Sequence, residues 1–267
     1  MMLVVRLFAL ALSLAVLPVL AAGKIEMQWF GQSCWKITTP EGKVIVTDPW
    51  ILQNPTTPAE LKNLDALGKV DLILVTHAHF DHFADAPALA KKNNAKIVGP
   101  QGLHSTMGTY GIVPAELTVR MGKGGTYSPF PGVKITATHA EHDSELVWPD
   151  AHGNKQVYVG GEPFGYIIDI DGFKIYHMGD TGLFGDMKFI GEYYKPDIVL
   201  IPIGGHFVMN PEDAAFATKT WLKPKYAVPM HYASNPFLKG TPAEYVKAMG
   251  DAPTKVFPIK QGEKLTF

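Results

Sequence analysis

Short apolar segments separated by turn residues fill the first half of the chain. Segments rich in β-branched and aromatic side chains, bounded by Gly and Pro, predict β-strands. They occur at residues 25–30, 34–38, 43–47, 72–75 and 95–98. Segments typical of helices lie between or after them, at residues 59–67, 85–93 and 104–110. The pattern therefore predicts three antiparallel strands at the start, followed by alternating helices and strands.

The second half of the chain repeats this arrangement. Strands are predicted at residues 133–138, 165–170, 174–177, 197–202 and 226–230. A helix is expected over 210–222, because Asn210 suits the N-cap, Pro211 the first helical position and Asp213 the positive end of the helix dipole. Two halves of this kind predict an α/β fold of four layers. This fold is an αβ/βα sandwich, with two mixed sheets face to face and helices outside.

Composition and charge favour one soluble domain that acts on a small molecule. The chain has 267 residues, 46% of them hydrophobic, which is enough for a single large core. Its 24 Lys and Arg nearly balance its 25 Asp and Glu, so no basic surface for nucleic acid or membrane is expected. We found no linker or repeat that would divide residues 23–267 into domains. Association into a homo-oligomer is left open.

The first 22 residues have the pattern of a secretory signal peptide. Arg6 precedes an apolar stretch over residues 7–20, and Ala21-Ala22-Gly23 offers a cleavage site. A transmembrane anchor is the alternative, but the stretch is short and contains Pro18. We therefore expect export to a bacterial periplasm or secretion, with no membrane attachment after cleavage. Cys34 is the only cysteine, so no disulfide can form within the chain, and a buried apolar role is favoured.

Three imidazoles and one carboxylate lie in the run from Thr76 to His82, directly after a predicted strand. Imidazole nitrogens and carboxylate oxygens are ligands that zinc and related metals accept. The alternative, a loop that merely contains several His, is disfavoured because packing and solvation rarely explain such a cluster. The candidate ligands in this run are His77, His79, Asp81 and His82.

Further ligand-type side chains follow four other predicted strands. Residues 139–144 contain two imidazoles, His139 and His142, that compete for one role. The other three places each supply one principal candidate, and these are Asp180 after Tyr176-His177, His206 after Gly204-Gly205, and His231 after Pro229-Met230. Small residues around Asp180 would let the backbone approach an ion.

The order HxHxDH, a later His, GDT and a later HY resembles the metallo-β-lactamase superfamily. The similarity is greater to one branch, the UPF0173 metal-dependent hydrolases, which are related to ascorbate-phosphate lactonases. It covers most of the chain after the signal, through the motifs at residues 48–55, 76–82, 176–181, 202–206 and 229–232. One departure is a longer, polar insertion over Glu145 to Gly161.

The resemblance implies a ligand set for two metal ions. His77, His79 and His142 would bind one ion, Asp81, His82 and His231 the other, and Asp180 would bridge them. His142 is preferred to His139 because it follows Ala140-Glu141 and lies close to Ser144; His139 would then line the pocket. Asp48 and His177 would orient the ligands, although an Asp before Pro49 is also typical of a turn. Trp50 and Trp148 would either line the pocket or pack locally.

The expected activity is hydrolysis of a small ester, lactone, amide or phosphodiester. A hydroxide shared by two divalent ions would attack the substrate. Zinc is the default metal, and manganese, iron or nickel would suit the same ligands. Asp81 and His206 are the candidate catalytic residues; His206 would stabilise the oxyanion, protonate the leaving group or only position the substrate. The alternatives are a β-lactamase and a non-catalytic periplasmic metal-binding protein, since fold alone does not fix chemistry.

Overall fold

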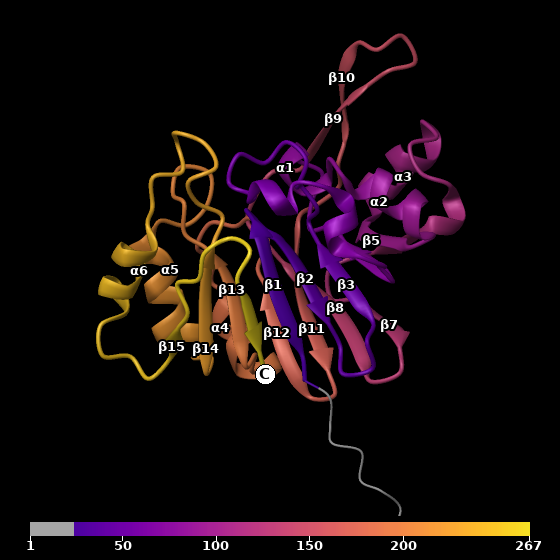
Figure 1. Cartoon of the computed structure of the whole chain (residues 1–267). Helices are drawn as coiled ribbons and strands as arrows, with labels where there is room; N and C mark the ends of the chain where they lie inside the picture. The colour runs from indigo at the N-terminus through magenta and orange to yellow at the C-terminus, as the bar shows by residue number, and fades with distance from the viewer. Residues whose placement is uncertain (1–23) are drawn as a thin grey trace, which may run out of the picture.

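The computed structural model describes residues 24–267 and shows two large β-sheets packed face to face (Figure 1). The predicted signal peptide lies outside the described residues. Among residues 24–267, no helix is both long enough and apolar enough to cross a membrane.

The first sheet has seven strands, and its order is β16-β1-β2-β3-β4-β5-β6. The first three strands along the chain pair antiparallel, and β3 to β6 pair parallel. The strands are β1 (Glu26–Gly31), β2 (Cys34–Thr38), β3 (Val44–Thr47), β4 (Leu72–Leu74), β5 (Lys96–Pro100), β6 (Thr118–Met121) and β16 (Lys264–Thr266).

The second sheet also has seven strands, in the order β15-β14-β13-β12-β11-β8-β7. Strands β7, β8, β11 and β12 pair antiparallel, and β12 to β15 pair parallel. The strands are β7 (Thr126–Phe130), β8 (Val133–His139), β11 (Phe164–Ile170), β12 (Phe173–His177), β13 (Ile198–Pro202), β14 (Tyr226–Met230) and β15 (Lys255–Val256).

Alternation along the strands divides the apolar side chains between the central core and the outer layers. In β1, Trp29 packs between the sheets while Phe30 faces the helices outside. Leu74 and Leu200 meet in the central core from opposite sheets. Because both faces of the parallel strands are covered, these strands are continuous apolar runs, which is why residues 72–75 were recognisable in the sequence.

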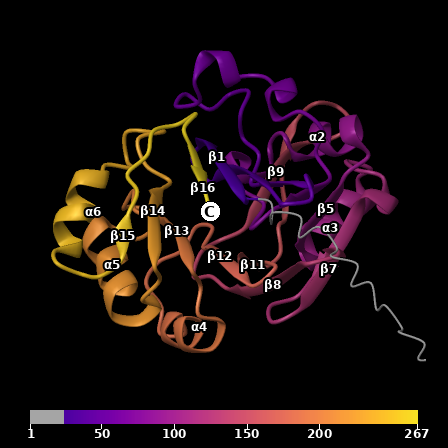
Figure 2. The same cartoon turned by 60° about the horizontal axis from the view of Figure 1, so that its bottom comes forward.

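Helices cover the outer face of each sheet, as the predicted αβ/βα sandwich requires. Short α1 (Phe80–Phe83), α2 (Ala86–Asn93) and α3 (Gln101–Thr109) lie on the side of the first sheet. Helices α4 (Met187–Tyr194), α5 (Pro211–Phe216) and α6 (Pro242–Met249) lie outside the second sheet. Figure 2 shows these two groups of helices on opposite sides of the sandwich. The predicted fold class is therefore confirmed.

Several elements differ from the sequence prediction. The prediction of one helix over 59–67 is wrong, and two 3₁₀ turns, Ala59–Leu61 and Leu64–Leu67, are found there. The chain starts a new turn at Asn63, because the Asn63 side chain accepts from the Ala66 N–H and caps it. The helix at 210–222 is confirmed, with Asn210 as its cap, but its second half, Ala217–Leu222, is π-helical. The insertion forms a hairpin of β9 (Glu145–Pro149) and β10 (Lys155–Val159), which projects from the sandwich (Figure 1).

Candidate metal centre

The run after β4 folds into a tight turn that presents its polar side chains at one end of the sandwich. The N–H groups of His82 and Phe83 both donate to the carbonyl oxygen of His79, which starts the short helix α1. His77 precedes this turn, and Asp81 and His82 lie within it. One strand end therefore supplies side chains in two directions.

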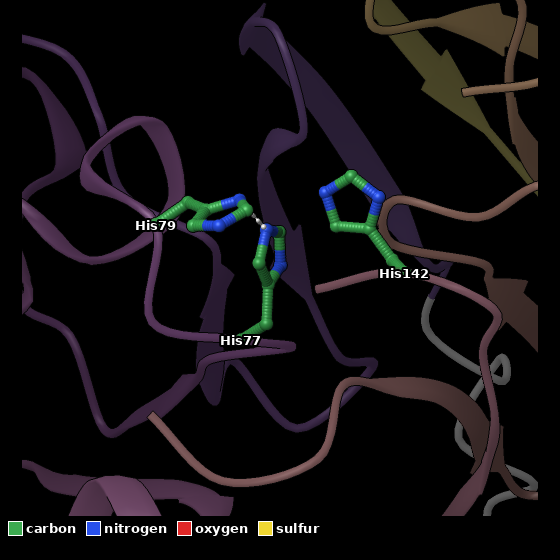
Figure 3. A group of neighbouring side chains, drawn as sticks. All are labelled: His77, His79 and His142. Carbon is green, nitrogen blue, oxygen red and sulfur yellow. Dashed lines mark hydrogen bonds between the residues drawn. The ribbon is translucent and has the colours of Figure 1, made fainter. Parts of the chain in front are cut away.

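His77, His79 and His142 form the first group of ligand-type side chains (Figure 3). One ligand atom from each lies within 4.8 Å of the others. His77 Nε2 is 3.0 Å from His79 Nδ1, and the His142 ring centre is 5.0 Å from that of His77. His139 lies elsewhere: it contacts Glu141 and packs against the ring of Phe184. Of the two competing imidazoles, the structure brings His142 to this group.

Asp81, His82, Asp180 and His231 form the second group, again with ligand atoms within 4.8 Å of one another. Asp180 lies centrally, with Oδ1 3.3 Å from His82 Nε2 and Oδ2 2.9 Å from His231 Nε2. Its Oδ2 is also 3.6 Å from Nε2 of His142, in the first group. Asp180 is therefore positioned to contact ions in both groups.

Gly179 allows Asp180 to approach so closely. Its φ of +62° is in the left-handed region, and a Cβ there would lie 2.8 Å from the carbonyl oxygen of Phe164 and 2.9 Å from Cβ of Thr76. Only glycine fits this turn without displacing the backbone of a neighbouring strand. The small residue noted in the sequence is thus required by a close contact.

Asp48 and His177 support the second group through hydrogen bonds to one of its members and to the backbone next to it. Asp48 is buried and accepts hydrogen bonds from the backbone N–H of Thr76 (2.7 Å) and from Nδ1 of His82 (2.9 Å). With Nδ1 of His82 bound in this way, its Nε2 faces the group. His177 donates from Nε2 to the Ser33 carbonyl and accepts from the N–H of Gly179. It therefore acts on the turn that carries Asp180.

Two buried atoms at the centre, Nε2 of His82 and Oδ1 of Asp180, lie 3.3 Å apart but form no hydrogen bond with each other or with any other residue of 24–267. Buried polar atoms normally have a partner, because desolvation without one costs about 1–3 kcal/mol. A cation between them would satisfy both. Five imidazoles and two carboxylates also match the ligands of zinc and its neighbours, so the residues fit a pair of transition metals.

The electrostatics of the two groups differ. Burial, followed by the nearby imidazole of His82, holds the pKa of His77 well below its ordinary value, so His77 is neutral. Burial also lowers the pKa of His142. At His231, burial opposes protonation, but the Asp180 and Asp81 carboxylates outweigh it and raise the pKa to about 9. Burial would raise the pKa of Asp81, yet His82 and His231 lower it to about 2.

Metal binding is therefore expected to compete with a proton on His231. Below about pH 9 the metal-free protein keeps this proton, and a metal ligand must be neutral. Zinc affinity should increase by about tenfold per pH unit between pH 6.5 and 8.5 for each proton displaced. Competition with a chelator at several pH values measures this slope, and a flat profile would contradict the assignment. The carboxylates that raise the pKa of His231 also stabilise the metal-free fold, by pairing with its protonated ring. This stabilisation is fully present below about pH 6.5 and is lost as pH rises through about 9.

A cavity of about 340 Å³ opens onto both groups. Its lining includes His79 and His142 of the first group and Asp81, Asp180 and His231 of the second. The other lining residues are Phe80, Asp143, Glu145, Phe207 and Asn235. Trp50 and Trp148 do not line it. Trp50 packs edge-on against Phe80 and Trp148 against Phe83, with ring centres 5.4 and 5.5 Å apart, and Trp148 also packs on the apolar layer outside the first sheet. Of the two interpretations of these tryptophans, local packing describes their positions.

His206 lies outside this cavity. It has a φ of +61°, is exposed and lines a neighbouring hollow with Asn210 and Phe237. The left-handed turn after Gly205 instead brings the next residue, Phe207, to the metal-centre cavity. The geometry gives no support to His206 as the group that binds an oxyanion or protonates a leaving group.

Gln32 is a site residue that was not predicted from the sequence. It is fully buried with a φ of +50°, and its Nε2 donates to Oδ2 of Asp81 at 2.8 Å. The same atom is 2.8 Å from Nε2 of His231. A left-handed conformation costs a non-glycine residue about 1 kcal/mol or more, so this position is held by the surrounding structure. The only sequence signal was a polar residue in a turn between two apolar strands.

Gln32→Ala is expected to weaken metal binding by about 10–100-fold, because Asp81 would lose the donor that orients it. Titration of metal-free protein with zinc against a chelator measures the effect. Exposed Gln53→Ala is the matched control and should bind like the wild type. Equal affinity in Gln32→Ala and the control would show that Gln32 is not a positioning residue.

Glu145 was also missed. It is the first residue of β9, and its Oε2 accepts from Nε2 of His79 at 3.2 Å. This contact leaves Nδ1 of His79 directed toward His77. The insertion, which the sequence shows only as a departure from the family pattern, therefore contacts the first group through Glu145.

Comparisons with known proteins agree with this architecture. Residues 26–231 match the family described as beta-lactamase superfamily domain. A UPF0173 metal-dependent hydrolase of Polaromonas sp. is 59% identical over 249 residues, or 92% of this chain and 91% of that protein. A UPF0173 metal-dependent hydrolase of Rubrobacter xylanophilus is 42% identical and covers 91% of this chain and 97% of its own length.

A solved structure is similar as well. Igni18, described as a novel metallo hydrolase from the archaeon Ignicoccus hospitalis, is 35% identical and has a TM-score of 0.79. The match covers 91% of this chain and 98% of Igni18. All seven side chains of the two groups lie within residues 26–231, the range of the family match.

Proposed function

We propose that this chain, which belongs to the UPF0173 family of metal-dependent hydrolases in the metallo-β-lactamase superfamily, acts through two divalent ions. His77, His79 and His142 would hold one ion, and Asp81, His82 and His231 the other. Asp180 would be shared. Zinc is the metal we propose first, and manganese, iron or nickel would fit the same donors.

The bound ions would supply a hydroxide nucleophile at neutral pH and positive charge that polarises the electrophilic oxygen of the substrate. The side chains keep this arrangement fixed. Asp180 and Asp81 stay ionised, because nearby imidazoles lower their pKa. Asp48 and Glu145 accept from His82 and His79 and so fix which ring nitrogen faces the centre. No Ser or Cys nucleophile is required for this chemistry.

The observation that carries the proposal is the position of Asp180 between the two groups. Its carboxylate lies within 3.6 Å of His82, His142 and His231, which belong to different groups. A carboxylate in this position can bind two cations at once. The proposed reaction class is therefore hydrolysis of a small ester, lactone, amide or phosphodiester.

A screen of metal-loaded protein tests the proposal. The panel contains simple esters, lactones, amides, bis(4-nitrophenyl) phosphate and nitrocefin, each with Zn²⁺ or Mn²⁺ and after chelation. We expect turnover of at least one substrate class that disappears with the chelator and returns with metal. No turnover in the whole panel by fully loaded protein would favour a metal-binding protein without catalysis, and turnover of nitrocefin alone would favour a β-lactamase.

We also propose that the protein is exported to the periplasm or secreted. The support is the sequence pattern alone, with Arg6, the apolar residues 7–20 and the small residues at 21–23. Mass spectrometry of the protein expressed in a bacterium should find a chain that begins near Ala22 or Gly23 in the periplasmic fraction. A full-length chain retained in the cytoplasm would contradict this.

A further inference from the structure

Apart from the candidate metal ligands, the lining of the metal-centre cavity offers no positive side chain to a substrate. Outside the two ligand groups it consists of two phenylalanines, two carboxylates and one amide: Phe80, Phe207, Asp143, Glu145 and Asn235. Sites for phosphoryl groups commonly add Arg or Lys to their metals, because these side chains pair with the phosphate oxygens. Neither residue type lines this cavity.

No positive charge remains in excess around the cavity once two divalent ions are bound. Two such ions would carry four positive charges, against four negative charges on the lining carboxylates Asp81, Asp143, Glu145 and Asp180 and a fifth on the proposed hydroxide. Asp81 and Asp180 alone would leave an excess of positive charge, which would favour an anion. Asp143 and Glu145 remove this excess, so the loaded cavity favours a neutral substrate.

Phe80 and Phe207 give the cavity two apolar walls. They are 62% and 49% exposed, so each offers apolar surface to a molecule in the cavity. Both rings are supported: Trp50 packs edge-on against Phe80 at 5.4 Å, and His206 packs edge-on against Phe207 at 4.4 Å. Supported rings offer apolar area at little cost in side-chain entropy. This packing gives Trp50 and His206 indirect roles at the site.

Asn235 supplies a hydrogen-bond donor in the same cavity. Its Oδ1 accepts from the backbone N–H groups of Phe237 (2.9 Å) and Leu238 (3.3 Å). These bonds fix which end of the amide is the oxygen, so the Nδ2 group is available to donate to a ligand. A carbonyl oxygen is an acceptor of the matching kind.

We infer that the substrate is a neutral carboxylic ester, lactone or amide with an apolar group, and that Phe80 and Phe207 bind this group. The inference rests on the proposed function and narrows it to carbonyl substrates without negative charge. Phosphodiesters and substrates with a free carboxylate are disfavoured, because Asp143 and Glu145 repel them. A phenyl group suits two phenylalanine walls, since aromatic pairs add to the energy of burial.

Two matched pairs of methyl esters test the inference on zinc-loaded protein, with a pH indicator that follows acid release. Methyl phenylacetate and methyl acetate differ in apolar size, and methyl butyrate and monomethyl succinate differ in charge. We expect kcat/KM to favour phenylacetate over acetate by at least about tenfold. We expect kcat/KM to favour methyl butyrate over monomethyl succinate by a similar factor. Asp143→Asn should reduce this second ratio, because it removes one negative charge that repels the succinate carboxylate.

Phe207→Ala and Phe80→Ala should each reduce the phenylacetate-to-acetate ratio at least about threefold, mainly through KM. Phe189→Ala is the matched control, because Phe189 is equally exposed on α4 but stacks on Tyr193, away from the cavity. Asp186→Asn, at an exposed carboxylate before α4, is the control for Asp143→Asn. Neither control should change the ratios.

The outcomes separate this inference from the proposed function. Equal or faster hydrolysis of monomethyl succinate, or ratios unchanged by both phenylalanine variants, would overturn the inference and leave a hydrolase of other specificity. Cleavage of bis(4-nitrophenyl) phosphate but of no carbonyl substrate would do the same. Failure to hydrolyse any ester, lactone, amide or phosphodiester would overturn the proposed function itself.

Discussion

Asp180→Ala is expected to reduce kcat/KM by at least about 10³-fold on any substrate that the wild type cleaves. The Asp180 carboxylate lies within 3.6 Å of imidazoles from both groups, so its loss affects both ions. Stabilisation by metal ions is worth several kcal/mol, and each 1.36 kcal/mol is a factor of about ten in rate. Metal content measured on the same samples should fall. His77→Ala and Asp81→Ala, one from each group, should behave in the same way.

Asp186→Ala is the control for this set, because Asp186 is exposed and its side chain makes no cap hydrogen bond to α4. Circular dichroism should show that each variant retains the fold, because the two sheets share a core that does not include Asp180. If Asp180→Ala fails to fold, His77→Ala and Asp81→Ala still carry the test. Wild-type turnover in a folded, metal-depleted variant would refute the role of these side chains.

His142→Ala and His139→Ala form the second pair, and their effects should differ by at least about 100-fold in kcat/KM. His142 reaches the first group and lies 3.6 Å from Asp180. His139, three positions earlier, is directed to Glu141 and Phe184. His142→Ala should therefore lose one metal ion and most activity, and His139→Ala should keep both.

The two variants are closely matched, because both residues lie in the same short segment and each substitution removes one imidazole. General damage to the segment would reduce both activities together. Greater loss in His139→Ala than in His142→Ala would contradict the assignment. Titration with zinc distinguishes a lost ligand from a lost fold, since a folded His142→Ala variant should still bind at the second group.

The sequence predicted the centre of this fold better than its borders. Strand β4 and the run that follows it were recognisable because a strand buried on both faces is a continuous apolar run, and ligand residues at its end have few other uses. Short edge strands such as β6 (Thr118–Met121) and β16 (Lys264–Thr266) carry a weak pattern, because one side of each lacks a neighbour. The pairing that defines β16 is with β1, at the other end of the described chain, which local pattern does not show.

The candidate ligands were predictable because chemistry restricts them, whereas the supporting residues depend on packing. Nothing local distinguishes Gln32 or Glu145 from other polar residues in turns and insertions, and their roles arise from contacts with Asp81 and His79 across the fold. Packing also decides where His206 and Trp148 lie, and their positions could not be predicted from residue type. Their residue types suited a site, but the backbone turns His206 into a neighbouring hollow, and Trp148 packs on Phe83.

Crystals of the protein grown with zinc, with anomalous diffraction recorded at the zinc edge, test the central claim most directly. We expect two anomalous peaks per chain, one among His77, His79 and His142 and one among Asp81, His82 and His231, with the Asp180 carboxylate contacting both. Elemental analysis of the dissolved crystals should give close to two ions per chain. A single peak with a stable content of one ion, or peaks remote from these side chains, would contradict it.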